Sequence, residues 1–476
     1  MREALAFYID GQWVAPSGTE IVDVIDPANA GVAGRVALGV AADVDKAVAA
    51  ARRAFDSFSR TSVAERAALL DAIIAAYQGR ADDLAAAVTA EMGAPHWLAS
   101  AAHVPLGLGH FQTARQILDS YSFSEQHGST RLDKEPIGVC ALITPWNWPL
   151  NQIACKVAPA IAVGCTMILK PSEVAPLTGH IFAEIMEEAG VPPGVFNLVH
   201  GDGPGVGAAL SAHPDVELIS FTGSTRAGVE VARAAAATVK RVHQELGGKS
   251  ANIILPSADL RAAVSGGVAA MMMNSGQSCN APSRMLVQRA SLEEAKVVAA
   301  EAAAEHTVGA PGSNAKLGPV VSEVQWTKIQ GLIDKGIEEG ATLIAGGPGK
   351  PDGLAEGYYV KPTIFADVTN DMTIAREEIF GPVLTILGYE DVDQAVAIAN
   401  DTPYGLAAYV QGAPEEALAL AARLRAGQVY LNYPELDLAA PFGGYKQSGN
   451  GREWGAHAFG EFLEVKAVLG ATPVAA

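Results

Sequence analysis

The stretch "ELISFTGSTRAGVEVARAAA", residues 217–236, contains in order the three parts of a parallel α/β unit. Its apolar start predicts a buried strand, Gly223 and Ser224 fall in a tight turn, and the remainder carries apolar residues at helical spacing. A helix N-terminus presents free N–H groups and a positive dipole end, which suits a pyrophosphate. An ordinary serine helix cap would give the same pattern, so this turn alone identifies no ligand.

The same alternation of strand and helix extends over most of the chain. Strands are predicted at 138–143 and in "TMILKPS" (166–172), and helices within 43–58 and 62–93. A second series begins after Gly248. The pattern predicts mostly parallel sheets with helices on both faces. The chain has 476 residues, and a single core rarely exceeds about 300 residues, so we expect at least two domains.

Two further segments have no obvious place in either core. The polar, alternating segment 119–136 predicts a hairpin that projects from the first domain. The segment "EFLEVKAVL", residues 461–469, predicts a final strand.

The composition excludes several classes of partner. The net charge of −19 argues against a nucleic-acid surface and against docking on anionic lipid. The longest apolar stretch, 157–169, is shorter than the roughly 20 residues that a membrane span needs, and the N-terminus has no signal-peptide pattern. The four cysteines form no C-x-x-C pair, which predicts reduced thiols, no metal site and a cytoplasmic protein.

Two glycine-containing motifs give only weak signals for nucleotide binding. The sequence "GGKS" (247–250) resembles the end of a phosphate-binding loop, but His243 stands where that motif needs its first glycine. The run "GDGPGVG" (201–207) lacks the acidic residue that should follow about 20 residues later. We interpret the second run as a turn and a helix start.

Three histidines are spaced by seven residues, at His96, His103 and His110. A continuous helix would place them on one face, which could suit a metal. Pro95 and Pro105 interrupt the segment, and no carboxylate joins it at ligand spacing. A structural role is therefore favoured.

The strongest candidate for a nucleophile is Cys279, in "NSGQSCNAPSR" (274–284). It follows an apolar helical segment and stands in a small, polar, glycine-containing run, where an inert core cysteine would be out of place. A cysteine nucleophile needs a lowered pKa, a group that stabilises an oxyanion, and access for water.

Seven motifs occur in the order found in one enzyme family. They are "ITPWNWPL", "LKPSE", "FTGST", "QELGGKSANII", "NSGQSCNAPSR", "EEIFGPV" and "PFGGYKQSGNGRE". From about Ile9 to Val468, the chain resembles the NAD(P)-dependent aldehyde dehydrogenase superfamily of the hydrolytic, non-acylating type. The resemblance implies a Rossmann-like cofactor domain, an α/β catalytic domain, and a small β extension for oligomerisation. These would comprise, respectively, residues 1–118 with 137–246, residues 247–448, and residues 119–136 with 449–476.

The resemblance also implies a reaction mechanism. Cys279 would attack the aldehyde as a thiolate, and the side-chain amide of Asn147 would hold the oxyanion together with the Cys279 backbone N–H. Glu245 would be the general base that activates water for hydrolysis of the thioester. Lys156 and Glu453 match residues that assist proton transfer.

The cofactor implied by the resemblance is NAD. Lys170 and Glu173 should contact the adenosine ribose, and Ser224 the pyrophosphate. The other residues that match cofactor positions are Trp146, Ser172, Gly223, Leu246, Gly247, Glu378 and Phe380. A 2′-phosphate would face the carboxylate of Glu173, so we expect NAD+ to be preferred over NADP+.

Four residues match positions along the substrate tunnel: Trp148, Cys155, Ser278 and Asn280. Cys155 replaces an aromatic residue that is usual in the family, so the tunnel should be wider there. None of the tunnel positions that we can place is Arg or Lys. We therefore expect uncharged aliphatic or aromatic aldehydes as substrates, rather than acid semialdehydes.

Other functions remain open from the sequence alone. An acid-semialdehyde dehydrogenase or a CoA-acylating dehydrogenase would keep Cys279, although transfer to CoA needs no base such as Glu245. A cysteine hydrolase or esterase would need a histidine partner for Cys279 and no dinucleotide site. By resemblance the chain should form a homodimer or a homotetramer.

Overall fold

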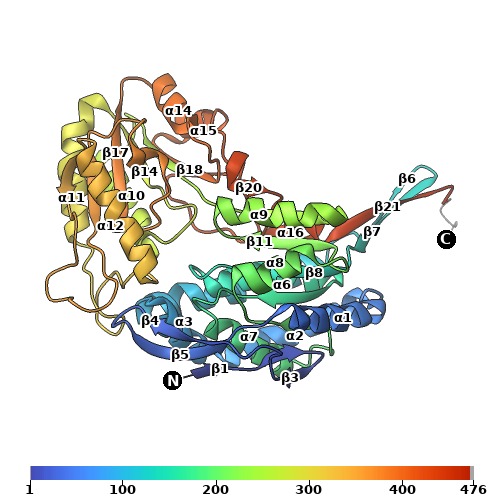
Figure 1. Ribbon diagram of the computed structural model, residues 1–476. Helices are drawn as coiled ribbons and strands as arrows, with labels where there is room; N and C mark the ends of the chain where they lie inside the picture. Colours follow the sequence, from blue (N-terminus) through green and yellow to red (C-terminus); the bar gives the residue numbers. More distant parts are fainter. Residues whose placement is uncertain (1, 472–476) are drawn as a thin grey trace.

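The computed structural model describes residues 2–471, so Met1 and residues 472–476 of the expected segments lie outside the described residues. Two α/β bodies lie against each other, and a β-structured arm projects from one of them (Figure 1). The first body is built mainly from the chain before residue 246, and the second mainly from the chain after it. Within the described residues, no helix is long and apolar enough to cross a bilayer.

The first body contains an eight-stranded sheet in the order β20-β12-β11-β8-β9-β10-β2-β3. Its parallel strands are β8 (Val139–Ile143), β9 (Thr166–Lys170), β10 (Phe196–Leu198), β11 (Leu218–Thr222) and β12 (Arg241–Glu245). The edge strands β3 (Gln12–Val14) and β20 (Gly449–Asn450), and β2 (Phe7–Ile9) next to β3, are antiparallel to their neighbours. The strand order reverses between β8 and β11, and ligands of open α/β sheets bind at such a reversal.

Helices cover both faces of this sheet, as the strand–helix alternation predicts. On one face α1 (Ala41–Phe58) packs on Ala141 and Ile168. On the other face α6 (Pro149–Val163) and α7 (Leu177–Glu188) pack on Cys140 and Leu142. Other helices of this body are α2 (Val63–Gly79), α3 (Ala81–Met92), α8 (Ala208–Ala212) and α9 (Thr225–Ala235). A small separate sheet is formed by β1 (Arg2–Ala4), β4 (Ile21–Asp26) and β5 (Gly31–Ala37).

The segment 96–118 differs from the expectation that proline interrupts it. It is helical throughout, as α4 (His96–Leu98), a π-helical turn (Ala99–His103) and α5 (Val104–Leu118). Pro105 directly follows the π-helical turn, in which the N–H of Val104 bonds to the oxygen of Ala99, and at such a turn the helix can continue without the N–H that proline lacks. The three histidines have separate partners: His103 stacks on Trp148 with ring centroids 4.1 Å apart, His96 lies 3.1 Å from the hydroxyl of Thr89, and His110 lies 2.7 Å from the side-chain oxygen of Asn151.

The second body contains a seven-stranded sheet in the order β15-β16-β17-β14-β13-β18-β19. The strands are β13 (Ala251–Ile254), β14 (Arg284–Gln288), β15 (Thr342–Ala345), β16 (Thr363–Ala366), β17 (Val383–Tyr389), β18 (Ala407–Gln411) and β19 (Gln428–Leu431). All are parallel to their neighbours except β15. Its helices are α10 (Leu260–Met272), α11 (Leu292–Ala304), α12 (Glu323–Glu338), α13 (Thr373–Arg376), α14 (Val392–Asn400) and α15 (Pro414–Ala421).

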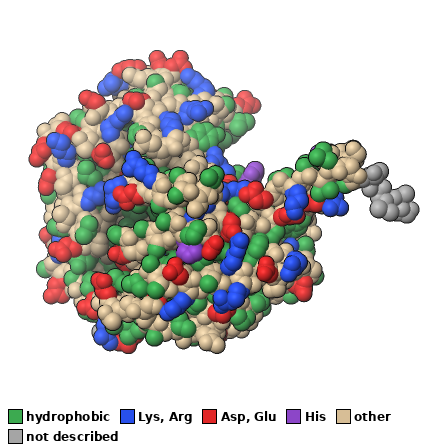
Figure 2. Space-filling model, turned by 45° about the vertical axis from the view of Figure 1, so that its right-hand side comes forward, with side chains coloured by type: hydrophobic (Ala, Val, Ile, Leu, Met, Phe, Trp, Pro, Cys, Tyr) green, Lys and Arg blue, Asp and Glu red, His purple; other side chains and the backbone are tan. Residues whose placement is uncertain are grey.

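The arm is a three-stranded antiparallel sheet in the order β21-β7-β6. It consists of β6 (Ser124–His127), β7 (Thr130–Pro136) and β21 (Leu463–Leu469), so the structure has the hairpin and the final strand where the sequence predicts them. Figure 2 shows the arm standing clear of the body with charged side chains along it. These charges include the ion pairs Lys134–Glu125 and Lys466–Glu135.

One expected boundary needs a correction. The resemblance implies that residues 449–462 belong to the oligomerisation extension. In the structure, β20 pairs with β12 of the first sheet. The helix α16 (Gly455–Glu461) packs against α5 and α6. The apolar side chains of Phe459 and Phe462 belong to the first core, which explains why this segment returns to it. Only β21 joins the arm.

Candidate active site

The candidate site lies where the carboxyl edge of the first sheet faces the amino ends of the strands of the second. Strand β12 ends at Glu245, and the chain then crosses to β13 through Gly247 and Gly248. A Cβ on Gly248 would lie 2.3 Å from the backbone oxygen of Cys279, so only glycine allows this approach. The two halves of the site are thereby held together by backbone packing.

A strained turn presents Cys279. After α10 ends, Asn274 and Ser275 adopt positive φ angles of 54° and 55°, a conformation that non-glycine residues rarely adopt. Gly276 follows with φ of 72°, and a Cβ there would lie 2.1 Å from the oxygen of Gly381. The backbone is therefore strained at the position where the chain turns toward the cavity.

Asn147 lies beside this turn, as the motifs predict. Its Nδ2 donates to the backbone oxygen of Gln277 over 3.0 Å. The side chain of Asn274 in turn donates to the backbone oxygen of Asn147 over 2.8 Å. These bonds fix the amide of Asn147 and use one of its two N–H groups, so the second can serve an oxyanion.

The thiol of Cys279 does not have the lowered pKa that a nucleophile needs. Burial raises the pKa of Cys279, and the carboxylates of Glu378 and Glu245 raise it further. Backbone N–H groups of Cys279 and Asn280 act in the opposite direction but do not outweigh the burial. The thiol must therefore lose its proton to a base, or meet a positive charge, before it attacks.

Cys279 opens into a cavity of about 550 Å³ whose walls are largely apolar, with several aromatic side chains among them. Its lining includes Trp148, Ser278, Asn280, Tyr409, Tyr430, Tyr433, Phe442 and Trp454. The hydroxyls of Tyr409 and Tyr433 donate to the backbone oxygens of Asn280 and Ala263, over 3.1 and 2.7 Å. Because these hydroxyls are occupied, the rings contribute apolar surface. Among the described residues that line the cavity, Glu453 is the only charged one.

The expected tunnel residue Cys155 needs a correction. It is 2% exposed and does not line the cavity. Cys155 lies one helical turn beyond Asn151 and Gln152, which do line it, and it packs with Phe442 and Trp454. Trp454 comes from the far C-terminal end of the chain and covers Cys155, so replacement of an aromatic residue here does not widen the tunnel.

Beneath the cavity lies a layer of buried charged and polar groups, which we call the buried polar layer: Lys156, Ser220, Thr222, His243, Glu245 and Glu453. Lys156 forms an ion pair with Glu453 and also donates to Ser220 and Thr222, over 3.1 and 2.8 Å. Burial lowers the pKa of Lys156, but Glu453 more than offsets this, and the net shift is upward. Burial raises the pKa of Glu453, but Lys156 outweighs it, and the net shift is downward. Both groups are therefore charged.

Glu245 is only 1% exposed, and both its carboxyl oxygens lack a hydrogen bond within the described part of the chain. Burial raises the pKa of Glu245 well above its ordinary value, and the carboxylate of Glu453 adds to this. A raised pKa suits a group that accepts a proton near neutral pH. A Cβ on Gly443 would lie 2.7 Å from Oε1 of Glu245, so glycine leaves room for the carboxyl there.

The residues expected to bind a dinucleotide gather along the carboxyl edge of the first sheet. Trp146 follows β8, Lys170 ends β9, and Ser224 follows β11. Leu246 and Gly247 follow β12, and Ser172, Glu173 and Gly223 extend the same edge. Ser224 caps α9 by accepting from the N–H of Ala227, so the free N-terminus of this helix faces the point where the strand order reverses. This donor set fits a dinucleotide.

Two residues of the second body close the same crevice. Glu378 accepts from the N–H of Gly248 over 2.9 Å, and a Cβ on Gly247 would lie 2.6 Å from its Oε2. The rings of Phe380 and Trp146 meet edge to face, with centroids 5.4 Å apart. These contacts join the motifs "EEIFGPV" and "ITPWNWPL", which lie far apart in the sequence.

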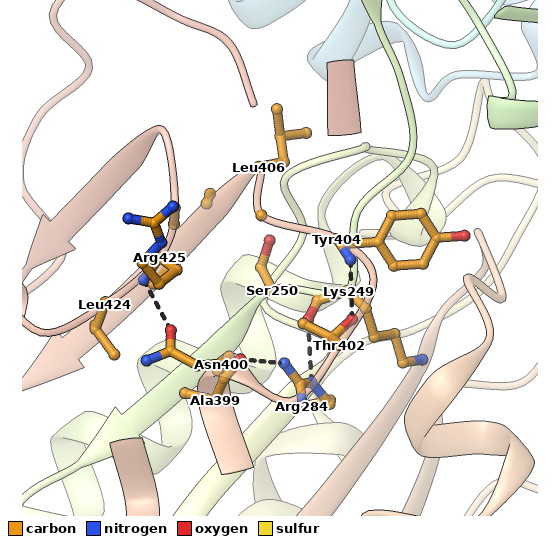
Figure 3. Close-up of a pocket in the computed structure, with 15 residues that line it drawn as sticks. Lys249, Ser250, Arg284, Ala399, Asn400, Thr402, Tyr404, Leu406, Leu424 and Arg425 are labelled. Atoms are coloured by element: carbon orange, nitrogen blue, oxygen red, sulfur yellow. Dashed lines mark hydrogen bonds between the residues drawn. The ribbon is translucent and has the colours of Figure 1, made fainter. Parts of the chain in front are cut away.

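Lys249 is held at the start of β13 through its backbone. Its backbone oxygen accepts from the buried guanidinium of Arg284 over 3.0 Å, and Arg284 also donates to the backbone of Ala399 (Figure 3). A further bond from Arg284 goes to the backbone oxygen of Ile398. Burial lowers the pKa of the Lys249 ammonium to about 7. The residues after Gly248 therefore anchor the start of β13, as their resemblance to the family implies.

Several functional residues had no signal in the sequence. Tyr409 lies in the middle of β18, Tyr430 within β19 and Tyr433 just after it, and an aromatic residue is usual in any strand. Trp454 and His243 reach the site only through tertiary contacts. In the sequence, His243 only breaks a phosphate-loop pattern. That pattern does not predict its position beside Glu245.

Comparisons with known proteins identify the family. The model of the "Aldehyde dehydrogenase family" matches residues 13–468. The chain belongs to the aldehyde dehydrogenase family and is an oxidoreductase that acts on aldehydes. The fold is the aldehyde dehydrogenase fold.

Individual relatives cover almost the whole chain. A 3-succinoylsemialdehyde-pyridine dehydrogenase of a Pseudomonas species is 58% identical over 473 residues, 99% of each chain. A mutant of aldehyde dehydrogenase C from Pseudomonas syringae, solved with NAD+ and octanal, is 54% identical with a TM-score of 0.98, covering 99% of this chain and 98% of that one. An indole-3-acetaldehyde dehydrogenase mutant of P. syringae, solved with NAD+, is 38% identical with a TM-score of 0.95, covering 98% and 97%.

Proposed function

We propose that this enzyme oxidises an uncharged aldehyde to its carboxylic acid through a covalent thioester on Cys279. The observation that carries the proposal is the position of Cys279 beside the fixed amide of Asn147, at the end of an aromatic cavity. After the thiol has given its proton to a base, the thiolate sulfur adds to the carbonyl carbon, and the new oxyanion is held by Asn147 Nδ2 and the Cys279 N–H. Loss of hydride from this adduct leaves the thioester.

Hydrolysis then needs a base, and we assign this role to Glu245. Its carboxyl takes a proton from water as the water adds to the thioester carbon, the C–S bond breaks, and the acid leaves. Support comes from the raised pKa of Glu245 and from its position just before Gly248, whose backbone lies against Cys279. A CoA-acylating enzyme would not need this base.

The hydride acceptor that fits the carboxyl edge of the first sheet is NAD+. When bound, it accepts the hydride that leaves the aldehyde carbon. Lys170 and Glu173 would hold the adenosine ribose, and they already form an ion pair of 3.2 Å. A 2′-phosphate would face the Glu173 carboxylate, so we propose a preference for NAD+ over NADP+. NAD+ is also the cofactor in solved relatives.

For the substrate, we propose aldehydes with uncharged, apolar bodies. A distal carboxylate would meet Glu453 rather than a cation among the described lining residues. Octanal, present with one relative, is such an aldehyde, and the name 3-succinoylsemialdehyde-pyridine describes an aldehyde that carries an aromatic ring. Both bodies suit aromatic walls.

We further propose that the enzyme forms a homodimer or homotetramer through its arm. Val465 and Leu469 of β21 are 64% and 83% exposed, and a solitary three-stranded arm leaves unpaired strand edges. Light scattering at micromolar concentration should report at least twice the mass of one chain. A single-chain mass would contradict this part of the proposal.

The experiment that tests the proposed function mixes the protein with NAD+ and octanal. Reduced nicotinamide and octanoate should form in equal amounts, and acid quenching should trap an octanoyl group on the peptide that contains Cys279, as seen by mass spectrometry. Succinate semialdehyde, offered in parallel, should give a much lower kcat/KM. Turnover without an acyl group on Cys279, or a clear preference for succinate semialdehyde, would contradict the proposal.

A further inference from the structure

The side chain nearest to the carboxyl of Glu245 belongs to a residue with no assigned role. His243 lies two residues before Glu245 on β12, so both side chains project from the same face of the strand. Nε2 of His243 is 3.4 Å from Oε1 of Glu245, and both side chains are 2% exposed. Neither atom has a hydrogen bond within the described chain. Two buried polar atoms without partners therefore face each other at slightly more than hydrogen-bond distance.

The other ring nitrogen determines which tautomer His243 adopts. Nδ1 of His243 lies 3.5 Å from the hydroxyl oxygen of Ser220, its register partner on β11. That oxygen already accepts from the ammonium of Lys156 over 3.1 Å. The hydroxyl hydrogen of Ser220 is then free to point at Nδ1, which leaves the ring proton on Nε2, directed at Glu245.

Charged groups face His243 from every element around it: Lys156 of α6, Glu453 and Arg452 after β20, and Glu245 on its own strand. Glu461 of α16 also raises the pKa of Glu245 through its charge. Burial lowers the pKa of His243 to about 4, so the ring is neutral at pH 7. The fold also makes room for the ring, because a Cβ on Gly451 would lie 2.3 Å from its Cδ2.

We propose that His243 is a positioning residue for the general base: its Nε2–H donates to the ionised carboxyl of Glu245 and thereby favours the form that accepts a proton. The proposal rests on the proposed role of Glu245. A hydrogen bond to a buried carboxylate stabilises the charged form and lowers its pKa, opposing the desolvation that raises it. A shift of 0.2–0.5 Å would bring the two atoms within ordinary hydrogen-bond distance.

The test is the pH profile of thioester hydrolysis in the full enzyme with NAD+ and octanal. His243→Phe removes the N–H and keeps a ring, so the acid limb of steady-state turnover should move to higher pH by about one unit. His243→Gln places an amide N–H at a similar distance and should restore most of the original limb. The burst of reduced nicotinamide, which precedes hydrolysis, should keep its amplitude in both variants.

His213→Phe is the matched control, because His213 lies after α8 with its Nε2 3.5 Å from Oδ1 of Asp45, away from Glu245. It should leave the acid limb where it is. An unchanged limb in a folded His243→Phe enzyme would overturn the proposal, as would a His243→Gln limb as far displaced as that of His243→Phe. If His243→Phe does not fold, His243→Gln and Ser220→Ala decide: Ser220→Ala should move the limb upward and His243→Gln should not.

Failure of this inference can be distinguished from failure of the proposed function. If Glu245→Gln stalls hydrolysis but His243→Phe leaves the pH profile unchanged, Glu245 remains the base and only the role of His243 is wrong. If Glu245→Gln turns over like the parent enzyme, the assignment of the base is wrong, and the inference fails with it.

Discussion

The cavity in front of Cys279 and the buried polar layer beneath it differ in their content of charged groups. The cavity has aromatic walls, and the hydroxyls of Tyr409 and Tyr433 are bonded into the protein. The buried polar layer holds the Lys156–Glu453 ion pair almost without exposure. The first region can select a substrate by shape and apolar contact, and the second can hold or move a proton where bulk water is excluded. Changes in the first should alter substrate choice, and changes in the second should alter stability and hydrolysis.

The largest effect should come from the proposed nucleophile. Cys279→Ala removes the sulfur that forms the thioester, so kcat with octanal should fall by at least about 10³-fold. Thermal unfolding should be nearly unchanged, because the turn around Cys279 is held by its backbone. Cys165→Ala is the control: this buried thiol contacts the backbone oxygen of Phe462, and its loss should leave turnover intact. Comparable activity in both variants would contradict the assignment.

Breaking the ion pair tests the buried polar layer. Lys156→Met leaves Glu453 buried without its partner, and such a loss typically costs about 3–5 kcal/mol of stability. Urea unfolding should show this cost in the single variant and should show most of it restored in Lys156→Met/Glu453→Gln, where both charges are gone. A cost below about 1 kcal/mol would mean that the layer is more hydrated than its burial indicates.

The cavity should respond differently, through substrate choice. Trp148 stacks on His103 and donates from Nε1 to the hydroxyl of Ser278 over 2.8 Å. Trp148→Ala should lower kcat/KM for octanal by roughly 10–200-fold and leave acetaldehyde less affected, since only the longer aldehyde loses an apolar contact. Equal losses for both aldehydes would instead indicate that Trp148 supports the reacting centre itself.

The smallest effect is expected at the cofactor edge. Glu173 is 37% exposed, so its charge is screened and contributes about 1 kcal/mol. Glu173→Gln should therefore raise the ratio of kcat/KM for NADP+ to that for NAD+ by roughly fivefold. Glu188→Gln, at the end of α7, is the control and should leave the ratio unchanged. An unchanged ratio in Glu173→Gln would show that Glu173 does not select between the two cofactors.

The sequence predicts those parts of the site that lie in short motifs. Cys279 and the turn at Ser224 could be recognised because each lies in a local pattern with its own chemistry, whereas Asn147 could be assigned only through the resemblance of its motif to a family. Strand–helix alternation likewise predicts the two α/β bodies and the arm.

What the sequence does not predict depends on contacts between distant segments. Trp454 packs on Cys155 from nearly 300 residues away, and its neighbour Glu453 contacts the same thiol at a sequence separation of 298. The π-helical turn at 99–103 keeps the helix continuous across Pro105, and local propensity alone favours a break there. The role proposed for His243 follows from its burial and from the strand register, neither of which any spacing in the sequence specifies.

The central claim is that Glu245 acts on water after hydride transfer, and the pre-steady state of Glu245→Gln tests it most directly. The parent enzyme and the variant are each mixed rapidly with NAD+ and octanal, and reduced nicotinamide is followed by absorbance. We predict that Glu245→Gln gives a burst of about one equivalent per active site, then a steady state at least about 10²-fold slower than that of the parent. A steady state equal to the parent's, or loss of the burst in a folded variant, would contradict the claim.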